Sequence, residues 1–350
     1  MKLTSIVAGL ILAAAGLQGA VVPLTAAESG GDFYKGKQIQ LVVGSTPGGV
    51  YDVYARLVAE HLPNHIPGKP TIVVQNMDGA SGLKAAIFLN SVAPRDGTTI
   101  LSTLSSVPTA PLFTPQAATF DVTKFSWIGS ITKDPFVGYV WHTAPVKTLE
   151  DARTTEVIMG GNSVGAAGVD MAIIGRDFFG LKIKIVTGYA GAPEVKLAIE
   201  NGEVHGTFAN AWGDLKTQRA YWLREGKIRL IVQHGFEKHP DLPDVPLFID
   251  LAKTPEDRQA LELLLARQEF SKPYFGPPGM PAERLAILRH AFDDTMKDPA
   301  FLAAVQKARL AVDGPMSGEQ LAAMVARLAA TPRPVVQRIE QAFTNYNAGK

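Results

Sequence analysis

Four glycine-rich turns carry the residues of this sequence that could do chemistry. They are residues 44–52 (Gly-Ser-Thr-Pro-Gly-Gly-Val-Tyr-Asp), 78–82, 160–165 and 188–192, and each follows an expected strand and opens an expected helix. A helix N-terminus presents unpaired N–H groups and the positive end of the helix dipole, and glycine lets a ligand approach the backbone closely. The turns therefore predict an anion site built from backbone and hydroxyl donors.

None of the four turns contains lysine or arginine. This composition favours a carboxylate over a phosphate, because a P-loop needs its lysine. It also favours a mono- or dicarboxylate over a tricarboxylate. Any single turn is explained more simply as a strand-to-helix connection, so it is the repetition of the pattern that indicates binding.

Residues 161–165 read Gly-Asn-Ser-Val-Gly, which is also the spacing of the nucleophile elbow of α/β-hydrolases. Asp250 and His290 follow Ser163 in the order that such a serine hydrolase requires. No His-Gly-Gly-Gly oxyanion motif precedes the elbow, and an anion-binding helix start explains the same turn. We therefore expect Ser163 to bind and not to attack, with a serine hydrolase as the competing hypothesis.

Asp52 lies in the first turn of an expected helix, four residues before Arg56. Two roles are open for its carboxylate: a helical i,i+4 ion pair, or a pocket group that orients donors. Trp212 follows an expected strand, and either packing or a pocket wall would explain it. The seven histidines show no metal-site spacing, so we expect neither a metal nor a cofactor.

Length and charge limit the class of protein. A chain of 350 residues predicts about two domains. Its 34 Lys+Arg and 33 Asp+Glu nearly cancel, which argues against a nucleic-acid partner and against long-range steering of an anion. The sequence has no cysteine, which excludes disulfides and thiolate metal sites.

Short β-type runs alternate with amphipathic helical stretches, the pattern of an α/β protein with largely parallel sheets. Residues 148–151 (Thr-Leu-Glu-Asp) look like a capping box that opens a helix. The pattern restarts near residue 157, and the chain after residue 279 is almost wholly helical. No flexible linker separates the blocks, so we expect the chain to cross between two lobes near residues 134 and 269. The strands are expected at 38–43, 71–74, 98–104, 127–131, 137–141, 157–159, 183–186, 204–208 and 228–232.

Three segments carry a family resemblance. Residues 48–56 resemble the Gly-Gly-x-x-Asp-x-x-Ala-Arg signature of the tripartite tricarboxylate transporter receptors, the Bug family. Residues 76–82 resemble its Asn-x-x-Gly-Ala-x-Gly, and residues 94–101 its Pro-x-Asp-Gly-x-Thr-Leu. The resemblance covers nearly the whole chain after residue 27. It implies a type II periplasmic binding protein of Venus-flytrap fold, with lobe one at 28–133 plus 269–350, lobe two at 134–268, and a ligand cleft between them.

The resemblance also implies a function and a site. The function is that of a monomeric receptor, not that of an enzyme. The receptor binds a small organic acid and delivers it to a membrane permease. The alternative is that it delivers its signal to a sensor kinase. Ser45 stands where the family commonly has an aromatic residue, and Ala190 where it often has a basic one, which leaves the specificity open. The implied ligand-binding residues are Ser45, Thr46, Gly48, Gly49, Val50, Tyr51, Asp52, Ser105 and Ser106 from lobe one, and Asn162, Ser163, Val164, Gly165, Tyr189, Ala190, Gly191 and Trp212 from lobe two.

The N-terminus has the layout of a cleaved signal peptide. Lys2 forms a short basic region, residues 6–17 are a continuous run of apolar and small residues, and residues 25–27 (Thr-Ala-Ala) end in small side chains. The apolar run is too short to cross a bilayer comfortably, and the lack of cysteine excludes a lipoprotein anchor. We place the signal peptide at 1–27 and the mature protein in the periplasm.

We predict that the mature chain starts at Glu28. Cleavage after Ala27 removes Lys2, so the formal charge falls from +1 to zero. Intact-mass spectrometry of a periplasmic extract would check this start. Recovery of only the uncleaved chain, and only from the cytosol, would contradict it.

Overall fold

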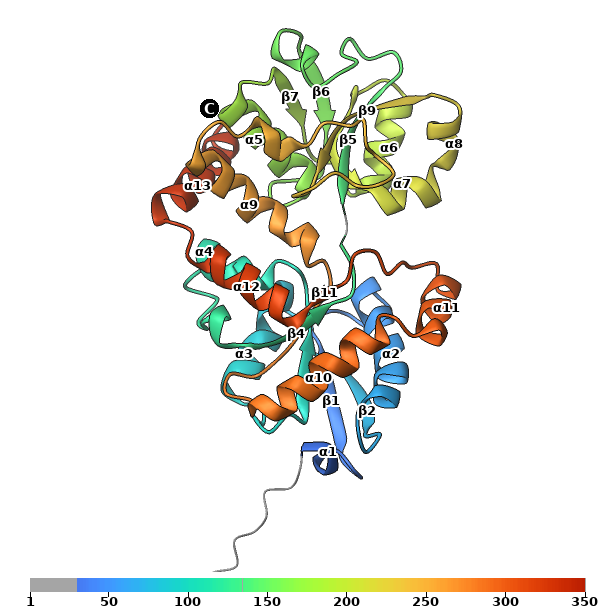
Figure 1. Ribbon diagram of the computed structural model, residues 1–350. Helices are drawn as coiled ribbons and strands as arrows, with labels where there is room; N and C mark the ends of the chain where they lie inside the picture. The colour runs from blue at the N-terminus through green and yellow to red at the C-terminus, as the bar shows by residue number, and fades with distance from the viewer. Residues whose placement is uncertain (1–29, 134, 350) are drawn as a thin grey trace, which may run out of the picture.

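The structure, a computed structural model, describes residues 30–133 and 135–349 and has two lobes, each built on one sheet (Figure 1). The first sheet has the strand order β11-β4-β10-β3-β1-β2, and the second β7-β6-β8-β5-β9. The predicted two-lobed α/β fold is confirmed. The first sheet comprises β1 (Gln38–Val43), β2 (Thr71–Asn76), β3 (Thr99–Ser102), β4 (Ser126–Ser130), β10 (Pro273–Gly276) and β11 (Met316–Ser317), and the second β5 (Phe136–Trp141), β6 (Val157–Gly160), β7 (Ile183–Val186), β8 (Gly206–Ala211) and β9 (Ile228–His234).

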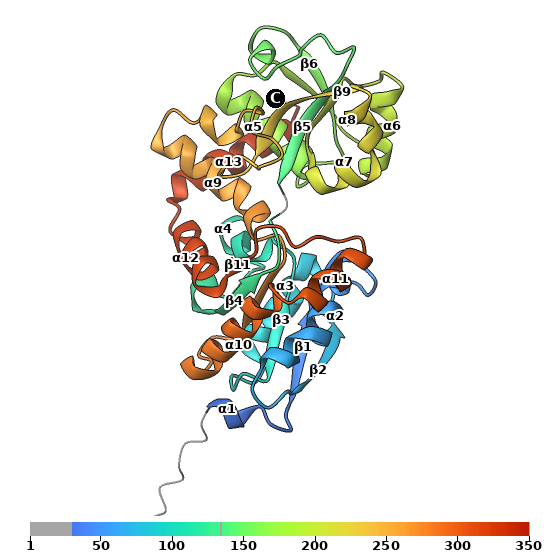
Figure 2. The ribbon, with the colours of Figure 1, turned by 45° about the vertical axis from the view of Figure 1, so that its right-hand side comes forward.

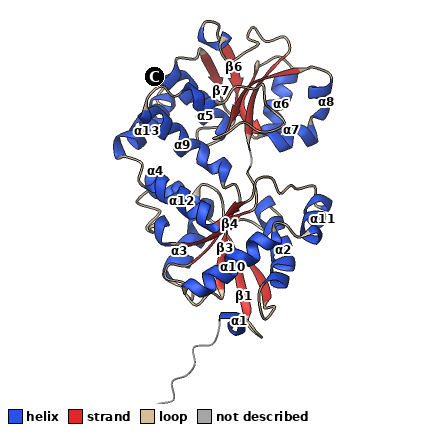
Figure 3. Ribbon diagram, in the orientation of Figure 1, coloured by secondary structure: helices blue, strands red, loops and turns tan. Residues whose placement is uncertain are grey.

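Helices cover both faces of each sheet (Figure 3). Those around the first sheet are α1 (Gly30–Phe33), α2 (Val50–His61), α3 (Leu83–Ser91), α4 (Ala110–Phe113), α10 (Ala282–Thr295), α11 (Pro299–Lys307) and α12 (Gly318–Ala329). Those around the second are α5 (Ala167–Phe179), α6 (Ala192–Glu200), α7 (Trp212–Gln218), α8 (Ala220–Arg224), α9 (Pro255–Glu269) and α13 (Arg333–Asn347).

Strand β1 lies between β2 and β3 in the first sheet, and its sequence shows why this segment folds as a strand. It pairs in parallel with β2 and β3, with Leu41 opposite Val74 on one side and Ile100 on the other. Ile39 and the run Leu41–Val43 are fully buried. An alternating start followed by an apolar run is what a strand covered on both faces requires.

The sheets are mixed, whereas the sequence indicated largely parallel ones. Strand β5 runs antiparallel to β8 and β9, and β10 runs antiparallel to β3 and β4. Both strands enter their sheet directly from the other lobe. The parallel strands β1 and β3 end towards the cavity between the lobes, so a strand that enters the sheet from that side runs in the opposite direction.

The predicted helix at 148–151 is also wrong. The segment makes only a 3₁₀ turn at Asp151–Arg153. The Asp151 carboxylate accepts the backbone N–H groups of Lys147 and Thr148, at 2.8 and 3.0 Å, and so closes a local turn. Strand β6 begins at Val157, which leaves too few residues for a helix.

The chain passes between the sheets three times, as Figures 1 and 2 show. It crosses between β4 and β5, between α9 and β10, and again between α12 and α13, since α12 packs on β4 and α13 packs on α5 and α9. We propose a lobe division that follows these crossings: 30–133 with 269–332 as lobe one, and 135–268 with 333–349 as lobe two. It differs from the division suggested by the resemblance in moving α13 to lobe two.

One prediction tests the antiparallel junction of β5 and β8. A Cβ added to Gly206 would lie 2.0 Å from the Tyr139 carbonyl oxygen and 2.9 Å from the Val140 Cα, both of them backbone atoms. Gly206→Ala should therefore lower the free energy of unfolding by about 1–3 kcal/mol or more. Gly213→Ala is the matched control, because its Cβ would meet nothing within 4 Å and alanine favours helix. Equal urea midpoints for the two variants would contradict the close approach.

Candidate functional site

The first glycine-rich turn lies where the strand order of the first sheet reverses. Strand β1 has β2 on one side and β3 on the other, and ligands of open α/β sheets bind at such a switch point beyond the carboxyl ends of the strands. Residues 44–49 follow β1 here and lead into α2. The turn is therefore at the edge of lobe one that the fold makes available to a ligand.

The Asp52 carboxylate holds this turn in shape. It is 2% exposed and accepts hydrogen bonds from the Gly48 N–H at 2.8 Å, Arg56 Nε at 2.9 Å and Asn76 Nδ2 at 2.9 Å. Asn76 Nδ2 also donates to the Ser45 carbonyl at 3.0 Å. Burial raises the pKa of Asp52, but these donors outweigh it and hold the pKa below its ordinary value. The ion pair with Arg56 is thus part of a network that positions the loop.

Lobe two uses a similar device at the start of α5. The Gly165 N–H donates to Asp170 Oδ1 at 2.7 Å, as the Gly48 N–H does to Asp52. Asn162 joins the two glycine-rich turns of this lobe: its Nδ2 donates to the Ala190 carbonyl at 3.2 Å, and its carbonyl accepts the Gly188 N–H at 2.9 Å. The turns at 160–165 and 188–192 therefore form one continuous rim.

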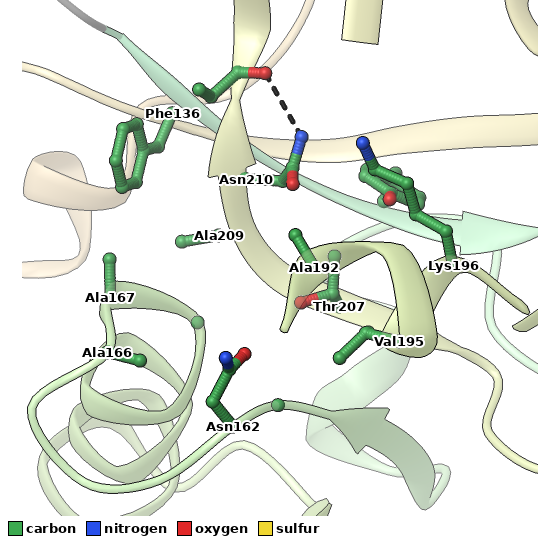
Figure 4. A pocket seen from close by; sticks show the side chains of 14 residues that line it. Phe136, Asn162, Ala166, Ala167, Ala192, Val195, Lys196, Thr207, Ala209 and Asn210 are labelled. Atoms are coloured by element: carbon green, nitrogen blue, oxygen red, sulfur yellow. Dashed lines mark hydrogen bonds between the residues drawn. The ribbon is translucent and has the colours of Figure 1, made fainter. Parts of the chain in front are cut away.

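A cavity of about 180 Å³, the lobe-two cavity, lies inside this rim (Figure 4). Helices α5 and α6 both begin at its wall, at Ala167 and Ala192. Lys196 also lines it, but its Nζ is 2.5 Å from Asp214 Oδ2, so its charge is already balanced. The cavity thus offers helix N-termini and amides, with no unbalanced cation among the described residues that line it.

Tyr139 lines the same cavity, and its hydroxyl is enclosed by protein. It is buried and has no hydrogen-bond partner among the described residues. Burial raises the pKa of this hydroxyl, so it is a neutral donor at any physiological pH. A buried donor without an acceptor is costly.

A second cavity of about 340 Å³, the interlobe cavity, lies between the lobes. Tyr51 and Ser105 line it from lobe one, and Asp170 from lobe two. Arg267, at the end of α9, and Lys272, just before β10, line it from the crossing segment. This cavity therefore receives side chains from both lobes and from the chain that joins them.

Two residues connect the cavities. Phe136 and Ala167 line both the lobe-two cavity and the interlobe cavity. A larger open groove of about 830 Å³ continues from the interlobe cavity between α7 and α11, sharing Val50 and Lys272 with it. Trp212 is a buried wall of this groove and donates from Nε1 to Asp241 Oδ2 at 3.1 Å.

Arg267 and Lys272 are not among the residues predicted from the sequence, because that prediction rests on the glycine-rich turns, which contain no cations. The signal that could have found them is their position next to the expected crossing at residue 269. Lys272 Nζ lies 4.9 Å from the centre of the Tyr51 ring. The site is therefore cationic even though its turns are not.

The predicted site residues divide into two groups. Those that line the three cavities are Val50, Tyr51, Ser105, Asn162, Gly165 and Trp212. The others belong to the loops beside the cavities without lining them: Ser45, Thr46, Gly48, Gly49, Asp52, Ser106, Ser163, Val164, Tyr189, Ala190 and Gly191. Their contribution to a ligand stays a prediction.

The structure does not assemble the hydrolase triad. Ser163 is exposed in the loop after β6 of lobe two, whereas His290 is on α10 of lobe one (Figure 1). Within residues 30–133 and 135–349, no hydrogen bond joins Ser163, Asp250 or His290 to one another. Ser163 is therefore not hydrogen-bonded to either of the two residues that the triad hypothesis assigns to it.

The described chain has neither a membrane-spanning helix nor a cluster of metal-binding side chains. None of its helices has the length and apolar character needed to cross a membrane. Nor do its histidine, aspartate and glutamate side chains form a group of three that could hold a metal ion.

Comparison with known proteins agrees with the family resemblance. The model of the tripartite tricarboxylate transporter family receptor matches residues 54–341. Protein BugT of Bordetella pertussis is 26% identical over 264 residues, which are 72% of this chain and 75% of that protein. A solute-binding protein from Polaromonas, solved without ligand, superposes with a TM-score of 0.69 at 20% identity, covering 87% of this chain and 99% of that one. A protein of R. palustris solved with adipate gives a TM-score of 0.55 at 21% identity, covering 88% and 97%.

One prediction concerns the pH dependence that Asp170 confers. Burial raises the pKa of its carboxyl from 3.8 to about 6, against the opposing effects of the Gly165 amide and the nearby Arg267 charge. Between pH 3.8 and about 6, the folded state therefore keeps a proton that the unfolded state has lost. This proton stabilises the folded state, and the stabilisation is lost as the pH rises through about 6. Asp170→Asn keeps an acceptor for Gly165 but does not titrate.

Relative to Asp170→Asn, the wild type should gain about 1 kcal/mol of unfolding free energy between pH 7 and pH 5. Urea unfolding of both proteins at the two pH values measures this difference. A difference that is the same at both pH values would contradict the raised pKa.

Proposed function

The chain belongs to the family of tripartite tricarboxylate transporter receptors, and from this premise we propose that it is a periplasmic receptor for a small organic acid, a mono- or dicarboxylate. It delivers this acid to a membrane permease of the tripartite tricarboxylate type. The observation that carries the proposal is the interlobe cavity, which Tyr51 and Asp170 line from opposite lobes and which two cations line from the crossing segment.

The chemistry of the cavities supports an anionic ligand. Arginine and lysine are the side chains that pair with carboxylates, and helix N-termini stabilise negative charge without any side chain. The lobe-two cavity adds the Asn162 amide and the N-termini of α5 and α6. Together these groups offer hydrogen-bond donors and positive charge, which a carboxylate needs and a neutral sugar or a cation does not.

The position of the cavities supports a receptor that closes on its ligand. A ligand that contacts both lobes binds more tightly when they are closed, and it shifts the population towards the closed form by that difference in affinity. A change of shape on binding is what a permease can recognise. The exposed Ser163, which in the described chain is hydrogen-bonded to neither Asp250 nor His290, gives no support to hydrolysis, and the alternative of a sensor-kinase partner has no feature of the structure in its favour.

We predict that small carboxylates stabilise the mature protein against heat. A ligand present at about 100 times its dissociation constant adds about 2.7 kcal/mol to the free energy of unfolding, which should raise the melting temperature by several degrees. A thermal-shift screen of mono- and dicarboxylates, with sugars and amines as comparison sets, measures this. If sugars or amines raise the melting temperature and no acid does, the receptor is not one for carboxylates.

The mature protein can also be used to test the serine-hydrolase hypothesis. Ser163→Ala should leave the ester-cleaving background unchanged, because the wild type has no turnover to lose. Saturable cleavage of short-chain nitrophenyl esters by the wild type that vanishes in the variant would overturn the receptor assignment.

A further inference from the structure

Arg309 has a backbone conformation that is unusual for a residue with a side chain. Helix α11 ends in a Schellman motif, in which the Leu310 N–H donates to the Val305 carbonyl at 3.0 Å. The Arg309 N–H completes the motif by donating to the Gln306 carbonyl at 2.9 Å. Glycine is the usual residue at this position, because the backbone is left-handed. Arg309 has a φ of 59°, a strain that concentrates at functional sites, so its side chain is a candidate for a function.

Hydrogen bonds to lobe one hold the segment that follows Arg309 in place. The Tyr54 hydroxyl of α2 donates to the Ala311 carbonyl at 2.6 Å and accepts the Ala311 N–H at 3.2 Å. Two residues further on, the Asp313 N–H donates to the Thr132 hydroxyl at 3.2 Å. The segment is thus attached at two points, and it forms part of the wall of the open groove between α7 and α11, which Arg309 lines.

The charge of the Arg309 side chain is exposed and unpaired. Within residues 30–133 and 135–349 this side chain makes neither a hydrogen bond nor an ion pair. The other cations that line the groove are engaged. Lys133 and Lys216 each pair with a carboxylate, and Lys272 donates to the Ser271 hydroxyl. Arg309 is therefore the cation of this wall that is available to an approaching anion.

The two acids that line the groove do not offset this charge. Asp214 forms an ion pair with Lys196, and the Asp313 carboxylate is hydrogen-bonded to His239 Nε2 at 3.1 Å. Four cations against two acids leave the lining with an excess of positive charge. The mature chain is expected to be formally neutral, so its attraction for an anion must come from a local wall such as this one.

We propose that Arg309 recruits the ligand: its charge draws a small carboxylate into the groove, from which the carboxylate passes to the interlobe cavity. This inference rests on the proposed receptor function and adds a residue that sets the rate of association. The groove shares Val50 and Lys272 with the interlobe cavity, whereas Arg309 lines only the groove. A charge at the entrance that makes no contact in the complex raises the association rate and leaves the dissociation rate unchanged.

The test measures association and dissociation separately. The probe is the tightest binder among pyruvate, lactate, succinate and adipate, and stopped-flow tryptophan fluorescence of the mature protein gives both rate constants. At an ionic strength of about 0.01 M, Arg309→Gly should lower the association rate constant roughly two- to tenfold, since unit charges at about 5–10 Å in water attract by this factor or more. Its dissociation rate constant should equal that of the wild type.

Ionic strength gives a second readout. At about 1 M salt the Debye length is about 3 Å, so the association rate constants of Arg309→Gly and the wild type should become equal. Calorimetry at both ionic strengths measures the dissociation constants independently of any fluorescence change. They should differ between the two proteins by the same two- to tenfold at low salt, and they should agree at high salt.

Two control variants separate the charge from the backbone strain. Arg309→Lys keeps a cation in the same left-handed position, so its rate constants should match those of the wild type. Lys69→Gly is the matched control, because Lys69 is an exposed cation with a φ of 45° that lines none of the three cavities. Its rate constants should also be unchanged. Glycine relieves the left-handed conformation, so neither glycine variant should melt at a lower temperature than the wild type.

The results that would overturn the recruiting role differ from the one that would overturn the receptor. An unchanged association rate constant in Arg309→Gly at low salt, or an equal loss in Lys69→Gly, removes the role and leaves the receptor function standing. So does faster dissociation from Arg309→Gly, or an equal loss in Arg309→Lys, because either places the guanidinium in the complex. A clear fall in the melting temperature of Arg309→Gly would make Arg309 a structural residue. If the wild type binds none of the four acids, the proposed function fails and the recruiting role fails with it.

Discussion

The passage of the chain between the lobes is the constraint on which the rest of this structure depends. Strands β5 and β10 each enter a sheet directly from the other lobe, and this makes both sheets mixed. The same passage brings Arg267 and Lys272 to the boundary between the lobes. A crossing segment lies beside the interlobe cavity, so its side chains line that cavity whatever the loops contribute.

Apolar packing decides which side of the molecule can open. One cluster of buried residues is continuous through both lobes and includes Trp127 of lobe one, Leu261 of α9 and Val336 of α13. Helix α13 extends this packing, because it returns to lobe two after α12 has covered lobe one. The groove between α7 and α11 lies away from these helices (Figures 1 and 2). This arrangement ties the lobes together along one edge and places the groove at the other edge.

The same local device has two different consequences in the two lobes. Asp52 and Asp170 both accept a glycine N–H at the start of a helix. Asp52 also has Arg56 and Asn76 as donors, and its pKa is held below the ordinary value. Asp170 is also buried and accepts, among the described residues, only the Gly165 amide, and burial raises its pKa to about 6. Asp52 is therefore part of a hydrogen-bonded network, whereas the Asp170 carboxyl interacts with the charge of Arg267 and can gain a proton near pH 6.

The sequence by itself determined the family, the two-lobed fold and the place of the glycine-rich turns, because motifs such as residues 48–56 and the period of apolar residues act locally. It also indicated a possible ion pair between Asp52 and Arg56, because residues four apart on a helix are neighbours. It could not tell that Asn76 and Gly48 would complete that network, nor that residues 151–153 would form only a turn. Only the tertiary structure decided that Tyr139, Phe136, Arg267 and Lys272 share one region, because contacts between residues far apart in the chain depend on how the lobes pack and not on any local pattern.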